Sequence, residues 1–296
     1  MSFEAQREKI KEICRDLLER GAVDAVIGYT EGGIEGARIP YIFDKPEEAE
    51  ALCWDDRCVP NLCTYTWDRK DKKLGIVAKP CDARGIVNYL AEKQLIRENI
   101  YIIGVDCDGM TDSDGEKLPG CWDCGVKTPP VSDVRIEGAA DGGGTDIGNG
   151  SVNGKDIGNG AAPDGRSGDF EKFKAEIDKC ILCFSCRQAC CGCYCRVCFM
   201  DRGVPNWQPA DPDFSAKMVY HLGRTMHLAG RCVECGACER VCASGVNVRY
   251  LIKEVTGFVE ELYGFRAGFD PEADPVMASY DFDDREVGFI GGDEHE

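Results

Sequence analysis

Apolar positions near the start of the chain first follow a helical pattern and then the pattern of a buried strand. Residues 3–20 carry apolar side chains three, four or seven positions apart, which predicts an amphipathic helix that ends at Gly21. The apolar run 23–29 is short and bounded by polar residues, and this predicts a strand.

A strand–helix–strand unit is predicted farther along. Residues 73–78 and 99–106 are short apolar runs, and residues 82–96 between them have helical spacing, with Asp82 as the predicted N-cap. Strands joined through a helix pair in parallel. Residues 1–137, the N-terminal domain, are therefore predicted to form an α/β domain with parallel strands.

The rest of the chain changes character twice. Residues 138–168 include eleven glycines, and such a sequence buries too little surface to offset the entropy of ordering it. We predict a linker or insertion there, with a binding loop as the alternative. Residues 169–265 have helical periodicity at 213–230 and 246–265, which predicts a mainly α-helical second domain. The polar, acidic residues 266–296 predict a C-terminal tail.

The charge of the chain restricts its partners. It has 53 acidic and 35 basic side chains, a formal net charge of −18, which argues against nucleic acid and anionic lipid as partners. The N-terminus lacks the apolar core of a signal peptide, and no stretch approaches the ~20 apolar residues of a membrane span. We expect a cytoplasmic protein with no nucleic-acid and no membrane partner.

Twenty cysteines then point to metal ligation. The cytosol keeps thiols reduced, and a chain of 296 residues is far longer than the small secreted domains that disulfides stabilise. Closely spaced cysteines in such a chain are typical of metal sites.

Two copies of one cysteine motif lie in the second domain. Each has the spacing C-x2-C-x2-C-x3-C of bacterial ferredoxins with two [4Fe-4S] clusters, in which the fourth cysteine binds the other cluster. Structural zinc is the weaker alternative, because zinc sites use paired C-x2-C units, often with histidine, and the chain has three histidines. The predicted ligand sets are Cys180, Cys183, Cys186 with Cys242, and Cys232, Cys235, Cys238 with Cys190.

The first motif departs from the ferredoxin pattern and continues into further cysteines. Proline follows the fourth cysteine in ferredoxins, whereas Cys191 and Ala243 stand at these positions. Because proline is not a ligand, we expect the clusters to tolerate its absence. The additional cysteines either form a further metal site or are buried beside a cluster; they are Cys191, Cys193, Cys195 and Cys198.

Cysteines also follow the predicted strands of the N-terminal domain. Cys81 lies between the strand 73–78 and the next helix, and Cys107 follows the next strand. Both therefore lie near the carboxyl edge of a parallel sheet, where α/β proteins bind ligands. Cys121 and Cys124 form a C-x2-C loop soon afterwards. Four thiols from neighbouring loops can form a cluster site. The competing cysteines are Cys53, Cys58 and Cys63, and Cys14 is predicted to lie in the core.

Three segments, GIVAKPCDARGI, IIGVDCDGM and CWDCGVKTPPVSDVRIEG, resemble the beta subunits of coenzyme F420-reducing hydrogenases and dehydrogenases. The resemblance covers about residues 20–137 and implies that Cys81, Cys107, Cys121 and Cys124 bind one [4Fe-4S] cluster. Residues 169–265, the ferredoxin-type module, resemble the 4Fe-4S dicluster modules that accompany heterodisulfide-reductase-type flavoproteins, hydrogenases and formate dehydrogenases.

The same resemblance raises the question of a flavin. Beta subunits of this family bind FAD and reduce the deazaflavin, and the glycine-rich residues 28–40 follow a predicted strand. They do not form the G-x-G-x-x-G motif, so a plain turn is the preferred interpretation.

We therefore expect an iron–sulfur electron-transfer subunit of a cytoplasmic, anaerobic oxidoreductase complex, with at least two and in our assignment three [4Fe-4S] clusters. Its expected partners are a flavoprotein like heterodisulfide reductase A at one end, and a hydrogenase, formate dehydrogenase or ferredoxin at the other. The alternative is an enzyme, a flavin-containing subunit that itself reduces coenzyme F420 or NAD(P). A zinc-binding structural protein is the third interpretation.

Overall fold

The computed structural model describes residues 1–138, 169–201, 213–277 and 279. The predicted glycine-rich linker, except for Gly138, lies outside the described residues, as does the predicted tail beyond residue 277, except for Ser279. No helix within the described ranges is long and apolar enough to cross a membrane.

Five strands form one sheet in the order β2-β1-β3-β4-β5. The strands β1, β3, β4 and β5 are parallel to their neighbours in this series, and β2 pairs with β1 in antiparallel orientation. The α/β prediction is thereby confirmed, although β2 and β5 were not predicted. The strands are β1 (Ala25–Glu31), β2 (Arg38–Phe43), β3 (Leu74–Ala78), β4 (Ile100–Val105) and β5 (Val134–Ile136).

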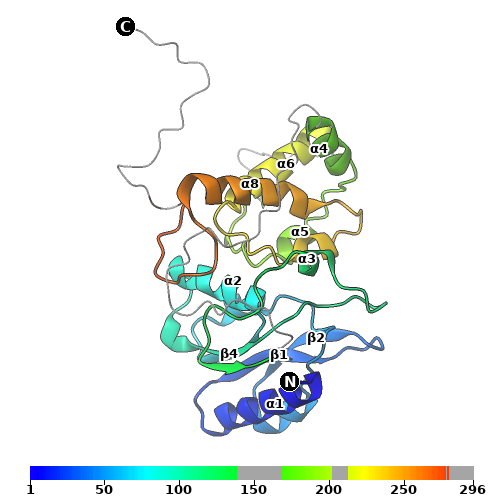
Figure 1. Ribbon diagram of the computed structural model, residues 1–296. Helices are drawn as coiled ribbons and strands as arrows, with labels where there is room; N and C mark the ends of the chain where they lie inside the picture. The colour runs from blue at the N-terminus through cyan, green and yellow to red at the C-terminus, as the bar shows by residue number, and fades with distance from the viewer. Residues whose placement is uncertain (139–168, 202–212, 278, 280–296) are drawn as a thin grey trace.

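Helices cover both faces of the sheet. Helix α1 (Phe3–Glu19) packs on β1, β3 and β5, and α2 (Pro80–Ala91) contacts β3 and β4 from the opposite side (Figure 1). Every residue of β3 is buried, as a parallel strand between two helical layers requires. Short 3-10 helices complete the layer around the sheet: η1 (Pro46–Ala51), η2 (Leu62–Arg69) and η3 (Arg97–Asn99).

The start of α2 differs from the prediction. Lys79, not Asp82, is the N-cap, and Asp82 lies three residues into the helix, where its carboxylate accepts a hydrogen bond from the Lys79 backbone N–H at 2.9 Å. Pro80 explains the earlier start, because proline has no N–H to leave unpaired and its fixed φ suits the first helical position.

The ferredoxin-type module lies on the α2 side of the sheet, at the opposite end of the molecule from α1 (Figure 1). The predicted helices at 213–230 and 246–265 are confirmed as α6 (Phe214–His227) and α8 (Val248–Tyr263). Both contribute to a separate apolar core around Tyr220 and Ile252. The remaining helices are α4 (Asp169–Asp178), α5 (Ser185–Gln188), η4 (Phe199–Asp201) and α7 (Ala237–Arg240).

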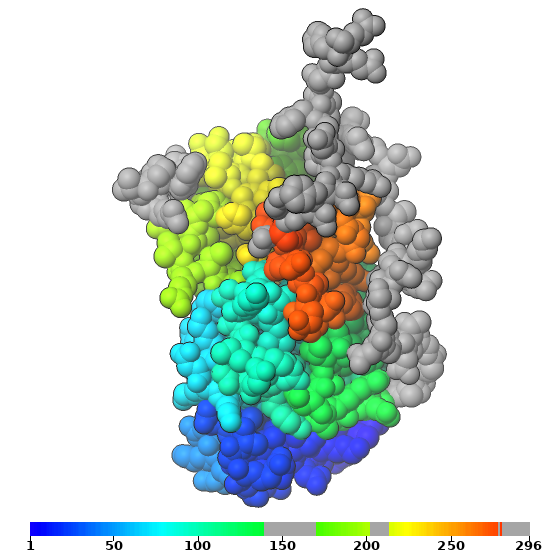
Figure 2. All heavy atoms as spheres, turned by 90° about the vertical axis from the view of Figure 1, so that its left-hand side faces the viewer, coloured from blue at the N-terminus to red at the C-terminus, as the bar shows by residue number. Residues whose placement is uncertain are grey.

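One face of α2 joins the two parts of the chain. Arg84 donates from Nη1 to the Val233 carbonyl at 3.0 Å and from Nε and Nη2 to the Ala267 carbonyl at 3.1 and 2.9 Å. One turn on, Asn88 donates to the Arg231 carbonyl at 2.8 Å. The segment after α8, coloured orange, lies against this part of the N-terminal domain (Figure 2). Buried polar side chains on α2 therefore hold the module.

A close backbone contact at Gly268 makes this junction sensitive to substitution. Gly268 has φ +83°, and a Cβ there would lie 2.5 Å from the Arg84 carbonyl oxygen. We expect Gly268→Ala to lower the free energy of unfolding by about 2–3 kcal/mol, measured by denaturant titration. Gly21→Ala is the matched control, because Gly21 has φ +62° but open space around it; it should cost about 1 kcal/mol. Equal losses would show that the Arg84 contact is unimportant.

Candidate iron–sulfur centres

The two C-x2-C-x2-C loops of the module repeat one unusual backbone conformation. Leu182 and Glu234, each two residues after the first cysteine of its motif, have φ values of 54° and 58°. Phe184 and Gly236, each four residues after it, have φ values of 60° and 70°. Residues other than glycine rarely adopt this left-handed conformation, because it costs about 1–3 kcal/mol per residue. Backbone strain of this kind is concentrated at functional sites.

In both loops a single-turn helix begins directly after the second left-handed residue. The helices are α5 in the first motif and α7 in the second, and each carries the third cysteine of its motif. Backbone N–H groups then point at cysteine sulfurs: that of Leu182 donates to Cys180 at 3.3 Å and that of Glu234 to Cys232 at 3.4 Å. Such donors stabilise thiolates, and both loops place one at the same position.

The first cysteine of each predicted ligand set lies near the other three members of that set. Burial raises the pKa of the Cys180 thiol, and the neighbouring cysteines that add to the rise are Cys186, Cys242 and Cys183. Burial likewise raises the pKa of Cys232, and its neighbouring cysteines are Cys190, Cys238 and Cys235. In each case the neighbours are the other three members of the predicted set, including the cysteine taken from the other motif.

The four additional cysteines do not converge on one point. Cys191 is buried, and hydrogen bonding between its thiol and Cys235 lowers the pKa of Cys235 to about 7. The other three line a second pocket, which we call the arginine pocket because four arginines also line it. Its cysteines are Cys193, Cys195 and Cys198, and its arginines are Arg187, Arg196, Arg224 and Arg231. A further metal site in the arginine pocket stays a prediction and would not include Cys191.

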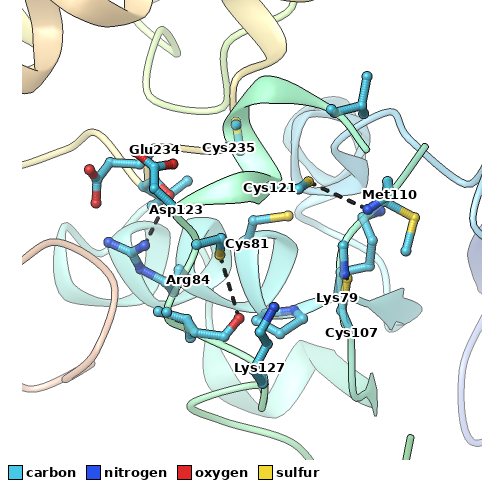
Figure 3. Close-up of a pocket in the computed structure, with 18 of the residues that line it drawn as sticks. Lys79, Cys81, Arg84, Cys107, Met110, Cys121, Asp123, Lys127, Glu234 and Cys235 are labelled. Carbon is cyan, nitrogen blue, oxygen red and sulfur yellow. Dashed lines mark hydrogen bonds between the residues drawn. The ribbon is translucent and has the colours of Figure 1, made fainter. Parts of the chain in front are cut away.

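The four predicted cysteines of the N-terminal domain line one pocket, the cysteine pocket (Figure 3). Cys81 lies in the first turn of α2 and Cys107 two residues beyond the end of β4, so both lie at the carboxyl edge of the sheet. Cys121 and Cys124 come from the loop that contains α3 (Pro119–Trp122). A fifth cysteine, Cys235 of the module, lines the same pocket.

The cysteine pocket suits a negatively charged group. The Gly109 N–H donates to the Cys107 sulfur at 3.4 Å and favours its thiolate, which offsets part of the burial that raises the pKa of this thiol to about 11. The Met110 N–H donates to Cys121 at the same distance. Six basic side chains against two acidic ones surround these thiols in a chain of net charge −18. The basic residues are Lys79, Arg84, Lys127, Arg240, Arg249 and Arg266, and the acidic ones are Asp123 and Glu234.

The second motif of the module and the cysteine pocket share a boundary. Gly120, beside Cys121, and Gly236, beside Cys235, meet backbone to backbone: a Cβ on Gly120 would lie 3.4 Å from the Gly236 Cα. Arg249 secures the contact by donating to the Asp123 carboxylate at 3.0 Å. The ligand set of the second motif is therefore the one next to the pocket.

Among the residues that the structure describes, no three His, Cys, Asp or Glu side chains are placed to hold a single metal ion. A [4Fe-4S] cluster, however, has four irons that each take one thiolate, so its thiols surround a volume rather than a point. Three groups of four cysteines, with N–H donors and basic residues around them, are a donor set that fits such clusters.

The competing cysteines lie elsewhere. Cys14, Cys58 and Cys63 are fully buried in the core of the N-terminal domain, as predicted for Cys14, and Cys53 does not line the cysteine pocket. Residues 28–40 form the hairpin of β1 and β2, closed by a hydrogen bond from the Gly32 N–H to the Ala37 carbonyl at 2.9 Å. The preferred interpretation as a plain turn agrees with this geometry, because no helix N-terminus follows to bind a phosphate.

Sequence reasoning missed the buried charged residues around these sites. Lys79, Asp82 and Arg84 are each at most 2% exposed, and Arg224 is 3% exposed. Three of these lie in the AKPCDARG stretch. Charged residues directly after a fully apolar strand were the available signal, since charges are rarely buried without a specific partner.

Comparison with known proteins gives relatives among the oxidoreductases. No family model matches the chain. The F420-dependent formate dehydrogenase subunit beta of Methanocaldococcus jannaschii is 20% identical, over 88% of this chain and 91% of that protein. The F420-dependent formate dehydrogenase 1 subunit beta of Methanococcus maripaludis is 22% identical, over 88% of this chain and 90% of that protein. The chain is thus similar, over most of its length and not only over residues 20–137, to beta subunits of F420-dependent formate dehydrogenases.

Proposed function

We propose that the chain is an iron–sulfur electron-transfer subunit of an oxidoreductase complex and holds three [4Fe-4S] clusters. The observation that supports this proposal is that Cys180 and Cys232 each lie near the other three cysteines of their predicted sets, while the four predicted cysteines of the N-terminal domain line one pocket. When bound, such clusters supply one-electron transfer. The chain's own residues hold the clusters, exclude water and set the surrounding charge.

The contact between Gly120 and Gly236 supports one spatial order of the three sets. The cysteine pocket adjoins the set completed by Cys190, and that set shares the module core with the set completed by Cys242. At the far end Cys183 is exposed, and its hydrogen bonding with Ser185 lowers its pKa. We place one electron partner at the cysteine pocket and the other over Cys183.

Formate dehydrogenase is the favoured complex, because the relatives are named as beta subunits of F420-dependent formate dehydrogenases and align over most of both chains. The partners are then a catalytic formate-oxidising subunit and an electron carrier, with a heterodisulfide-reductase-type flavoprotein or ferredoxin in that second place. The names also favour a second candidate, in which the chain binds a flavin and itself reduces coenzyme F420.

A cofactor count tests the proposal. After anaerobic purification with its co-purifying subunits, the chain is expected to contain about twelve irons and about twelve labile sulfides, quantified against chain concentration. About eight irons would contradict a cluster in the cysteine pocket, and about sixteen would add one in the arginine pocket. Flavin released by acid, at one per chain, together with reduction of coenzyme F420 by the isolated chain, would favour the second candidate.

A further inference from the structure

A buried arginine lies among the cysteines of both motifs without a carboxylate partner. Arg224, on α6, is 3% exposed. Its Nη2 donates to the Cys186 carbonyl at 3.1 Å, and its Nε is buried with no partner among the described residues. Within the part of the chain that the structure describes, no aspartate or glutamate pairs with this guanidinium.

Sulfur surrounds the guanidinium instead. The cysteines near enough to the guanidinium to favour its charged form are Cys190, Cys193, Cys238 and Cys186. Cys186 belongs to one predicted ligand set, whereas Cys190 and Cys238 belong to the other. Arg224 therefore lies between the two sets rather than beside one of them.

The buried charge of Arg224 needs an opposite charge nearby. An arginine side chain stays protonated in proteins, and a buried charge without an opposite charge is strongly destabilising. Protonated thiols are neutral and would not compensate it. Next to Arg224, His221 is also buried, and burial followed by the arginine's charge lowers its pKa to about 4, so it adds no second cation at neutral pH. Among the described residues near the guanidinium, the groups that become negatively charged when a cluster is bound are the cysteine sulfurs.

We infer that Arg224 is the internal counter-cation of the module, which compensates the thiolates of both ligand sets and raises the reduction potential of both clusters. This inference rests on the proposed function. A positive charge close to a cluster stabilises the added electron by Coulomb attraction, which is strong in a buried, weakly screened site. The chain has a net charge of −18, and this negative charge disfavours reduction of a cluster. The positive charge of Arg224 acts in the opposite direction.

Redox titration followed by electron paramagnetic resonance tests the inference on the anaerobic protein with its co-purifying subunits. Arg224→Gln removes the charge but keeps a donor for the Cys186 carbonyl, and Arg224→Lys keeps the charge. Arg196→Gln is the control, because Arg196 lines the same arginine pocket but is exposed. We expect Arg224→Gln to lower the reduction equilibrium constant of both clusters at least tenfold, or about 59 mV for one electron. The lysine variant and the control should change it less than about fivefold.

The outcomes separate this inference from the proposed function. Iron-free wild-type protein would refute the proposed function itself, and the counter-cation role with it. Fully loaded Arg224→Gln protein with wild-type potentials would overturn the counter-cation role alone. Should the glutamine variant lose its iron, the lysine variant decides: retained iron and near-wild-type potentials support the role of charge, whereas a tenfold change would show that Arg224 acts by packing.

Discussion

A chain in which Cys190, Cys191 and Cys193 are all replaced by alanine is expected to lose one cluster of the module and keep the other. Cys190 is grouped with Cys232, Cys235 and Cys238, although it follows the first motif in sequence. Its removal should therefore disturb the cluster of the second motif. Cys191 and Cys193 are replaced with it because each can offer a substitute ligand. The Cys191 thiol is a hydrogen-bond neighbour of Cys235, and the Cys193 thiol is a hydrogen-bond neighbour of Cys190.

The measurement is iron content together with paramagnetic resonance of the reduced protein. Iron should fall by about four atoms per chain. The resonance signal of the other module cluster should remain, and additional replacement of Cys242, its predicted fourth ligand, should remove that signal. Cys195→Ala is the matched control, because Cys195 is exposed and belongs to neither set. Loss of the cluster bound by Cys180 and retention of the other would contradict the exchange of cysteines between the motifs.

Asp82→Ala is expected to lower the free energy of unfolding by about 3–5 kcal/mol, because it leaves a lysine charge buried without its partner. Lys79 and Asp82 are 1% and 0% exposed, and the Lys79 Nζ lies 2.9 Å from the Asp82 carboxylate. The same carboxylate accepts a hydrogen bond from the Leu62 N–H at 2.7 Å. The substitution thus removes a charge and the acceptor of two backbone donors at the start of α2.

The effect should appear as a lower midpoint of anaerobic denaturant unfolding, with cluster absorbance as a second probe. Asp16→Ala is the control, because the side chains of Asp16 and Arg20 in their ion pair are 55% and 59% exposed, and its cost should stay below about 1 kcal/mol. If both variants unfold at the wild-type midpoint, the buried pair contributes nothing and Lys79 has another source of compensation.

Local patterns were sufficient for part of this architecture. The apolar runs of β1, β3 and β4 and the spacing of α1, α6 and α8 predicted those elements, because these strands are buried almost continuously and each helix buries one apolar stripe. The edge strand β2 was missed because only alternate residues are covered and none but Phe43 is fully buried. Strand β5 has three residues, too few to show a period.

Of the candidate sites, too, part could be predicted from local sequence and part could not. Cysteine spacing predicted the motifs because one loop supplies three thiols, and the position of Cys81 and Cys107 after strands predicted a shared sheet edge. Arg224 and the entry of Cys235 into the cysteine pocket depend on contacts between segments far apart in the chain. The periodicity of hydrophobic residues within a segment cannot predict such contacts. Buried Arg84 and Asn88 were unexpected for a related reason: the polar face of α2 binds the module instead of water.

The bonds from α2 to the module have a consequence for how the two parts can diverge. Arg84 and Asn88 donate to main-chain carbonyls of Val233, Ala267 and Arg231, and every residue type carries such a carbonyl. Most side chains on the receiving loops are therefore free to change without loss of these bonds, provided that the backbone keeps its path. The N-terminal domain carries the sequence requirement of these bonds, so a related module that keeps the loop backbone, Gly268 and the Arg249 partner of Asp123 could be exchanged on it by recombination.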